Sequence, residues 1–311
     1  MRPDFYRNFK ARVGPLKRMF SAIVGWLTVA LLHAIRRIDR KRTANLAGRA
    51  MRRIGPWRKE HRIGRANLAA AFPEKSPAEI ELILDGVWEN LGRVAAEFAH
   101  LDRLAFRDPE GSAPADINYD QTAVERFIAI RDGQRPTLLF ASHLANWEVP
   151  ALATFRFGLN ACLLFRPPNI AAVADSILKI RQGTMATLIP SSFGAPVQLA
   201  RALDNGTHVG MLIDQHDQRG VDVTFFGRTC KANPLLAQLA RHTGCAIRGA
   251  RVIRQPDGNS FRVEVTEPLE LPRDADGRVN VQQTMQAATS VIEGWVREHP
   301  EQWLWLHRRW R

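Results

Sequence analysis

The sequence predicts an α/β fold, in which a central, mostly parallel sheet is flanked by helices and preceded by a membrane-associated N-terminal helix. From residue 137 onward, short apolar runs alternate with stretches of helical periodicity. Runs such as "TLLFAS" and "HVGMLID" lack polar alternation, which indicates strands that are buried on both faces and therefore pair in parallel. The helical stretches between them supply the crossover connections that parallel strands require.

The individual elements follow from local signals. A helix is expected over "SPAEIELILDGVWENLGRVAAEF", because Ser76 can cap it, Pro77 fits its first turn and Glu79 completes a capping box. From residue 137 we expect strands at "TLLFAS", "ACLLFRP", "ATLIP", "HVGMLID", "CAIRGARVI" and "FRVEVTEPLEL", with helices at "NWEVPALATFRFG", "IAAVADSILKIRQG", "APVQLARALDNG", "NPLLAQLARHTG" and residues 281–298.

The positive charge of the chain is concentrated at its N-terminus. The net charge is +13, yet residues 1–65 carry 18 Lys or Arg against three acidic residues, so the remainder is slightly acidic. A basic segment can bind nucleic acid or an anionic membrane surface. No helix-turn-helix or RRM-like string is present, and the basic residues flank an apolar run, so the pattern favours a membrane over nucleic acid.

The apolar run is "MFSAIVGWLTVALLHAI", residues 19–35, which contains no charge. At about 1.5 Å per residue it is about 25 Å long as a helix, against a hydrocarbon core of about 30 Å. We expect residues 19–35 to form a membrane-anchor helix that spans the bilayer or enters one leaflet. The alternative is a buried helix of the globular domain. The expected division is a basic anchor segment, residues 1–40, followed by one domain, residues 41–311.

Cysteine usage points to a reducing compartment. Cys162, Cys230 and Cys245 are odd in number and form no C-x-x-C pair, which argues against a disulfide framework or a structural zinc site. Buried thiols are the default interpretation, and they indicate that the bulk of the chain lies in the cytosol.

The string "SHLANWE" carries the strongest sign of chemistry. His143 follows an expected buried strand, and Glu148 lies five positions later, where a helix begins. Ligands of α/β sheets collect at such strand ends, and a carboxylate that orients an imidazole creates a general base. No serine lies in a G-x-S-x-G elbow, so the base would activate a substrate hydroxyl in direct acyl transfer. The alternative is a structural His and Glu pair.

A second polar cluster follows a later strand. In "IDQHDQRG", Asp214, His216 and Asp217 raise the possibility of a metal site. We expect no metal, because these three candidate ligands lie within four residues and the sequence shows no distant fourth ligand. The next aromatic residues, Phe225 and Phe226, fit either the core or the wall of an acyl channel.

Several blocks of the chain resemble one protein family. The string "SHLANWE" looks like the H-x-x-x-x-[DE] motif of the lysophospholipid acyltransferase superfamily, in the form seen in the lauroyl and myristoyl acyltransferases of lipid A biosynthesis. The chain departs from that pattern at "FRPPN", where the family often has tyrosine before the arginine, and at Leu144 and Ala145, where phenylalanine or glycine is frequent. Within residues 62–310 the similar blocks are "RANLAAAFPEKS", "WENLGRVAAEF", "FRPPN", "IDQHDQRGVDVTFFGR" and "PEQWLWLHRRW".

The resemblance implies an O-acyltransferase that moves a fatty acyl chain from an acyl carrier protein or CoA thioester to a lipid A precursor. His143 would be the base and Glu148 its partner, while amides around Asn146 suit the oxyanion. No cofactor is implied. The implied location is the cytoplasmic face of the bacterial inner membrane. Asp214 and Gln215 would line the site, and Arg166, Arg228 and Lys231 would bind phosphate, with surface salt bridges or a solvated turn as the alternative for these three.

The sequence is compatible with three other functions. An acyltransferase for a phospholipid or an ornithine-type lipid would share the same motif, because the acceptor pocket cannot be read from the sequence. A nucleic-acid-binding protein would explain the basic N-terminus alone. A membrane scaffold without catalytic activity would leave "HLANWE" without a role.

Overall fold

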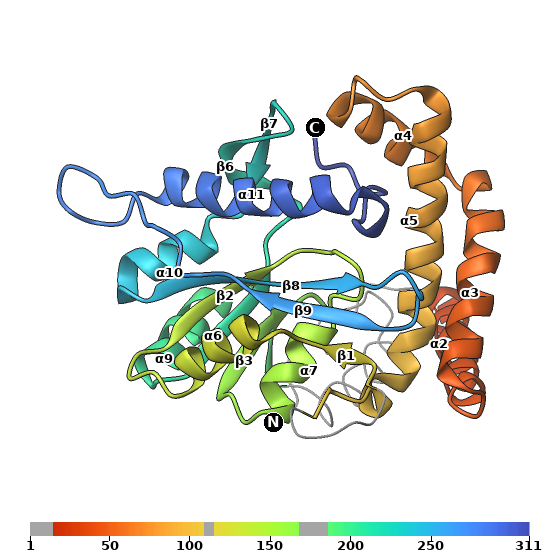
Figure 1. The fold of residues 1–311 in the computed structure, drawn as a ribbon, viewed down its shortest axis with the longest axis horizontal. Coiled ribbons are helices and arrows are strands. Elements are labelled where there is room, and N and C mark those ends of the chain that lie inside the picture. The colour runs from red at the N-terminus through yellow and green to blue at the C-terminus, as the bar shows by residue number, and fades with distance from the viewer. Residues whose placement is uncertain (1–14, 109–114, 168–185, 311) are drawn as a thin grey trace.

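The computed structural model describes residues 15–108, 115–167 and 186–310, and these contain a seven-stranded sheet (Figure 1). The strand order is β1-β9-β8-β2-β5-β3-β4, and every neighbouring pair is parallel except β8 and β9. The predicted mostly parallel α/β sheet is confirmed. Its strands are β1 (Ile117–Asn118), β2 (Thr137–Ala141), β3 (Ala161–Phe165), β4 (Thr187–Pro190), β5 (His208–Leu212), β8 (Ala246–Arg254) and β9 (Phe261–Val265).

Helices cover both faces of this sheet. Leu138 and Phe140 of β2 belong to the large core cluster with α9, α10 and α11, and the ring of Phe140 stacks on Trp295 of α11 at 5.6 Å. Leu139 points to the opposite face, where it packs against Ile130 of α6. A strand with neighbours on both faces needs the unbroken apolar run seen in the sequence. These helices are α6 (Gln121–Arg131), α7 (Val149–Arg156), α9 (Ala195–Asp204), α10 (Leu235–Thr243) and α11 (Val281–Glu298).

Helices from the first hundred residues form a layer beside the carboxyl ends of the parallel strands (Figure 1). The helix α5 begins with the predicted capping box, since Glu79 N donates to Ser76 Oγ and the Glu79 carboxylate accepts from Ser76 N. The helix expected over residues 170–183 lies outside the described residues. The N-terminal helices are α2 (Pro15–Ile35), α3 (Arg40–Ile54), α4 (Lys59–Ala71) and α5 (Pro77–Glu97), with 3₁₀ turns η1 (Gly55–Trp57) and η2 (Phe98–Arg103).

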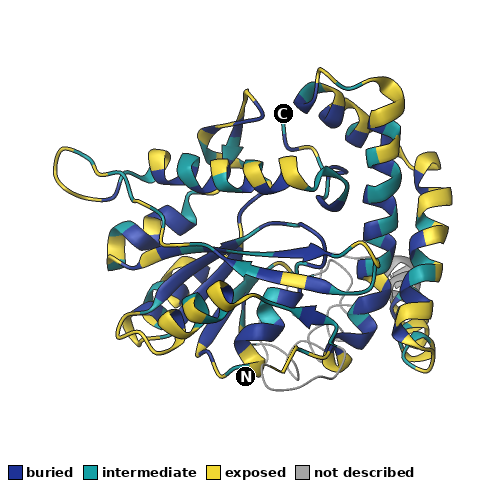
Figure 2. Ribbon diagram, in the orientation of Figure 1, coloured by how far each residue is buried: buried dark blue, intermediate teal, exposed yellow. Residues whose placement is uncertain are grey.

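The apolar N-terminal run lies within α2 and leaves much of its hydrophobic surface exposed. Among the described residues, no helix is both long enough and apolar enough to cross a membrane. Figure 2 shows that exposed residues also follow the outer side of α3. The large apolar side chains of α2 that are exposed are Met19, Ile23, Trp26, Leu27 and Leu31.

The segment around "VDVTFFG" forms a hairpin outside the main sheet. Strands β6 (His216–Phe225) and β7 (Arg228–Ala232) pair with each other in antiparallel fashion. The two turn residues, Phe226 and Gly227, have φ values of 52° and 68°, as a two-residue turn with positive φ requires. The Phe226 ring is buried and lies 5.6 Å from Trp305, so packing offsets the strain of that backbone conformation.

A buried polar network joins α5, β8 and the C-terminal segment. Glu97 is fully buried and accepts two hydrogen bonds from the Arg254 guanidinium, at 2.5 and 2.9 Å. Arg254 Nε also donates to Asn90 Oδ1 at 2.9 Å. Gln302, in the turn η3 (Pro300–Gln302), bonds through its side-chain amide to both backbone groups of Arg254. Because each buried charge has partners, the network holds these elements in one arrangement.

Candidate active site

The site lies where β2 and β5 end side by side. The register pairs Ala141 with Leu212, so His143 and Asp214 are each two residues beyond the last pair. His143 Nδ1 lies 2.8 Å from Asp214 Oδ1, and the His143 backbone N–H donates to Asp214 Oδ2 at 2.8 Å. Parallel pairing therefore brings together two residues that are far apart in the sequence.

The Asp214 carboxylate is enclosed by donors. Besides the two contacts from His143, the Trp303 indole Nε1–H donates to Oδ2 at 2.8 Å. Asp214 is only 3% exposed, and burial raises its pKa, but the charge of His143 and the hydrogen bonds from it lower that pKa more strongly, so the net shift is downward. The carboxylate is therefore ionised at neutral pH and acts only as an acceptor.

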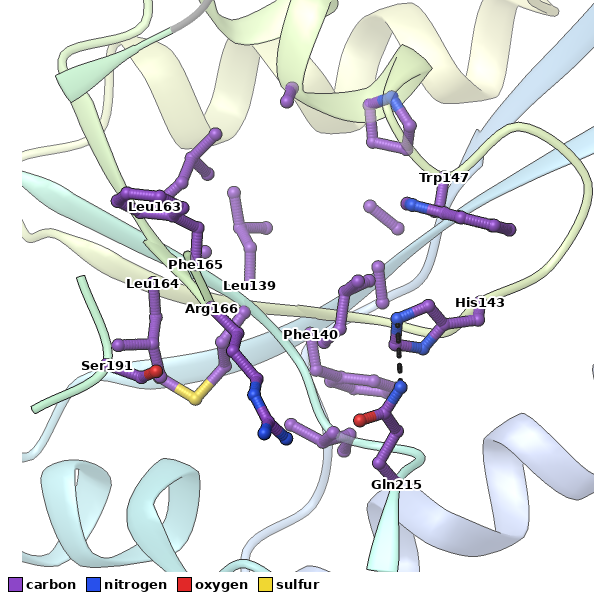
Figure 3. A pocket seen from close by; sticks show the side chains of 18 of the residues that line it. Leu139, Phe140, His143, Trp147, Leu163, Leu164, Phe165, Arg166, Ser191 and Gln215 are labelled. Atoms are coloured by element: carbon purple, nitrogen blue, oxygen red, sulfur yellow. Dashed lines mark hydrogen bonds between the residues drawn. The ribbon is translucent and has the colours of Figure 1, made fainter. Parts of the chain in front are cut away.

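This arrangement fixes the tautomer of the imidazole. Because the Asp214 carboxylate accepts, His143 Nδ1 must carry the hydrogen that is donated, and Nε2 keeps its lone pair in the neutral ring. The Gln215 side-chain amide nitrogen lies 3.4 Å from Nε2 (Figure 3). His143 thus presents an oriented proton acceptor beside an amide donor.

The pKa of His143 is raised above its ordinary value by its neighbours. Burial lowers the pKa, but the charge of Asp214, its hydrogen bond and the charge of Glu148 together raise it more. The imidazolium formed by proton uptake is therefore stabilised by two nearby carboxylates.

A cavity of about 430 Å³ opens beside His143. Its outer wall is polar, and the Arg166 guanidinium lies between Ser191 and Gln215 in Figure 3. Its floor consists of strand residues and is mainly apolar. The cavity thus offers a hydrocarbon chain a place to lie with its reactive end at the imidazole. The polar residues that line it include His143, Glu148, Arg166, Gln215, His216, Asp217 and Asn233, and the apolar ones include Leu139, Leu163, Leu164, Phe165, Leu188 and Leu212.

A comparison with known protein families finds that the family described as "Bacterial lipid A biosynthesis acyltransferase" matches residues 12–311. The chain belongs to this family. It is also 23% identical over 312 residues to "Lipid A biosynthesis acyltransferase 2" of Shigella flexneri, covering 96% of this chain and 95% of that protein. Membership of the acyltransferase family makes the protein an enzyme of the transferase type. The resemblance found in the sequence is confirmed.

In this acyltransferase the orienting carboxylate differs from the one expected. Glu148 was expected to hold one imidazole nitrogen, whereas the hydrogen bond at Nδ1 goes to Asp214. The loop after β2 turns tightly, with Ala145 at φ 48°, and Val149 N bonds to Asn146 O as α7 begins. Glu148 is buried and lines the same cavity, so it acts on His143 through its charge.

The Asn146 side chain, which was expected to contact substrate, bonds within the protein. Asn146 is fully buried, its amide Nδ2 donates to Glu97 Oε2 at 2.9 Å, and its Oδ1 accepts from Glu148 N at 3.2 Å. Both polar ends of the side chain are therefore used within the protein. Asn146 fastens the histidine loop to the buried Glu97 and Arg254 network, and this role depends on residues that are distant in the sequence.

The structure does not bring Arg228 and Lys231 to the cavity. Both belong to β7, outside the described residues that line it. Arg228 lies over the Trp310 ring at 4.9 Å, and Lys231 Nζ pairs with Asp222 at 3.0 Å. Of the three basic residues expected to bind phosphate, only Arg166 lies at the cavity.

The second polar cluster separates into different contacts. Asp217 accepts from Arg219 N at 2.9 Å and from Asn233 Nδ2 at 2.7 Å, while Asp214 is occupied by His143 and Trp303. Among the residues that the structure describes, no group of three or more His, Cys, Asp or Glu could hold a metal ion.

Sequence reasoning missed Trp303 and the part of Asp214 in holding the base. The closing block "PEQWLWLHRRW" contributed only to the family resemblance, and Trp303 was given no role. The residue type of Trp303 was the available clue, because a buried indole N–H usually donates to an acceptor.

We predict that the pKa of the His143 imidazole exceeds the ordinary value of about 6.5, and that Glu148→Gln lowers it because a negative charge is removed. Titration of ring-labelled histidine by NMR measures this. Glu125→Gln, on the exposed surface of α6, is the matched control and should leave the titration of His143 unchanged. An unaltered His143 pKa in Glu148→Gln would contradict the electrostatic role of Glu148.

Proposed function

We propose that this enzyme transfers a fatty acyl chain from an acyl thioester to a hydroxyl group of a lipid A precursor. One observation carries the proposal: His143 lines a cavity with a mainly apolar floor, while its Nδ1 is held by a buried, ionised Asp214. A positioned base next to a hydrocarbon-sized cavity suits acyl transfer to an alcohol. Membership of the lipid A acyltransferase family supports the class of acceptor.

The proposed reaction uses the imidazole twice. Nε2 of His143 takes the proton of the acceptor hydroxyl as its oxygen attacks the thioester carbonyl. This attack forms the new C–O bond and a tetrahedral intermediate, whose collapse re-forms the carbonyl and breaks the C–S bond. The imidazolium then gives its proton to the departing sulfur, which restores the neutral base. Asp214 stabilises the imidazolium between these two steps.

The amide of Gln215 is the proposed donor to the oxyanion. The sequence had suggested helix-start amides around Asn146, and two of these are used within the loop, since Glu148 N bonds to Asn146 Oδ1 and Val149 N bonds to Asn146 O. The Gln215 side-chain nitrogen lies 3.4 Å from Nε2 and lines the cavity, so it can reach an oxygen that develops charge there.

The proposed acyl donor is an acyl carrier protein or CoA thioester. Both present the chain on a phosphopantetheine arm, and the exposed Arg166 at the cavity could bind its phosphate or a phosphate of the lipid acceptor. An anionic lipid acceptor and an anionic donor are both compatible with the positive charge of Arg166.

We further propose that the enzyme acts at the cytoplasmic face of the bacterial inner membrane, held by α2. Its exposed apolar side chains suit insertion at the lipid interface. Residues 40–59, mostly in α3, carry eight Lys or Arg and no acidic residue, and Trp57 is 85% exposed. Basic residues beside an exposed indole suit the headgroup region of anionic lipids. The free, buried cysteines agree with a reducing compartment.

The role of Asp214 in holding His143 as the base is tested by Asp214→Asn. Its amide would present a donor to His143 Nδ1, so the imidazole would adopt the tautomer with hydrogen on Nε2 and lose its acceptor. We expect turnover to fall by about 10³- to 10⁴-fold, measured as mass of acylated lipid A precursor formed from an acyl thioester. Cys245→Ser, at another buried position, controls for loss of packing. Near-normal turnover in folded Asp214→Asn would refute the mechanism.

Phosphate binding by Arg166 is tested by Arg166→Ala. Removal of a charge-assisted contact to phosphate costs about 1.5–3 kcal/mol, so acceptor or donor use should fall by roughly tenfold to a hundredfold in kcat/KM. Arg228→Ala removes the same charge away from the cavity and should leave kcat/KM unchanged. Equal losses in the two variants would contradict a specific phosphate contact at Arg166.

Membrane binding is tested by Leu27→Glu in the full chain. Burial of a leucine side chain contributes about 1.5–3 kcal/mol, so partition onto anionic phospholipid vesicles should fall by about tenfold or more in sedimentation. Val197→Glu alters a similarly exposed position on α9, away from α2 in Figure 1, and should bind as the unaltered protein does. Unchanged partition of Leu27→Glu would exclude α2 as the anchor.

A further inference from the structure

Two rows of strand residues on one face of the sheet line the cavity, and Phe140, Leu164, Met211 and Ile213, which alternate with them, also line it. In the inner row, the register pairs Leu139 with Gly210, Gly210 with Leu163 and Leu163 with Leu188. Residues that pair in a parallel sheet point to the same face, and all four line the cavity. The outer row lies two residues nearer to the strand ends and contains Ala141, Leu212 and Phe165, which also line the cavity.

The inner row marks the closed end of the cavity. Two residues further from His143 on the same face are Thr137, Ala161 and His208, which are buried and are not among the described residues that line the cavity. Leu139 packs with Ala161 and with Ile130 of α6, so hydrophobic core begins directly behind the inner row. A chain that enters at His143 therefore passes the outer row and stops at the inner row.

Gly210 and Leu163 determine the space at that end together. A Cβ atom on Gly210 would lie 2.6 Å from Leu163 Cδ2, which is well inside van der Waals contact. The Leu163 side chain thus occupies the room that the absent side chain of Gly210 leaves. In Figure 3, Leu163 lies across the cavity from His143. Any side chain on Gly210 must push Leu163 aside and alter the end wall.

We propose that Leu163 and Gly210 set the length of the acyl chain that the cavity accepts. The inference rests on the proposed acyl transfer, which requires the thioester carbonyl to lie at His143 Nε2. With the carbonyl held there, the distance from Nε2 to the inner row limits the length of the acyl chain. The terminal methyl group then meets Leu163. One methylene that fits or fails to fit an apolar pocket changes kcat/KM by about 10- to 200-fold.

The test compares donors of different length in competition. Leu163→Ala should shift the preferred acyl thioester to a longer chain, and Gly210→Ala should shift it to a shorter one, each changing the kcat/KM ratio of adjacent lengths by about tenfold or more. Product masses report the ratio directly. Cys162→Ala is the matched control, because Cys162 belongs to the core on the opposite face of the same strand and should leave the preference unchanged.

A binding measurement separates this inference from the proposed reaction. Free fatty acids of graded length should raise the melting temperature of the full chain until the chain fills the cavity. The length that gives the greatest rise should increase in Leu163→Ala and decrease in Gly210→Ala. If both variants keep the optimal length of the unaltered protein, the inference is overturned. If the length dependence moves as expected but the unaltered protein transfers no acyl chain, the inference stands and the proposed reaction fails.

Discussion

The contact between Asp214 and His143 is the constraint around which the site is organised. One carboxylate oxygen holds the ring at Nδ1, and the other holds the backbone N–H of the same residue. Both the orientation of the imidazole and the path of its loop therefore depend on one buried side chain. The buried, ionised carboxylate is stabilised there because His143 supplies two donors and Trp303 a third.

Hydrogen bonds from neighbouring elements hold the loop that carries His143. The Ala145 N–H donates to Gln302 O, and Asn90 Nδ2 donates to the carbonyls of both Ala145 and Gln302. Asn90 is itself bonded to Arg254, which pairs with Glu97. The N-terminal helix layer, the sheet and the C-terminal segment thus meet beneath the loop that carries the base. Removal of one partner would leave a buried charge unpaired, so this network is suited to a rigid site.

The sheet and most of its helices could be predicted because their signals are local. The capping box at Ser76 and the unbroken apolar run of β2 each depend on a few adjacent residues. The position of His143 at a strand end was predicted for the same reason. The partner of His143 could not be found this way, because Glu148 is near in the sequence while Asp214 is near only through the pairing of β2 with β5.

Other residues make contacts that differ from the predicted ones for related reasons. Asn146 was expected to contact substrate, but its side-chain amide donates to Glu97 of α5. Arg228 and Lys231 were grouped with Arg166 by charge, although the hairpin of β6 and β7 turns out of the main sheet. Residue type indicates what a side chain can do, whereas strand order and buried polar pairing determine where it does so.

The most direct measurement is the turnover of the double variant His143→Ala with Asp214→Asn, compared with His143→Ala alone. In the proposed mechanism, Asp214 acts on the reaction only through the imidazole. Once His143 is absent, the second substitution should therefore change turnover by little, and the two losses should be far from additive. A double variant whose loss equals the product of the two single losses, in protein that remains folded, would contradict the claim that Asp214 and His143 work as one unit.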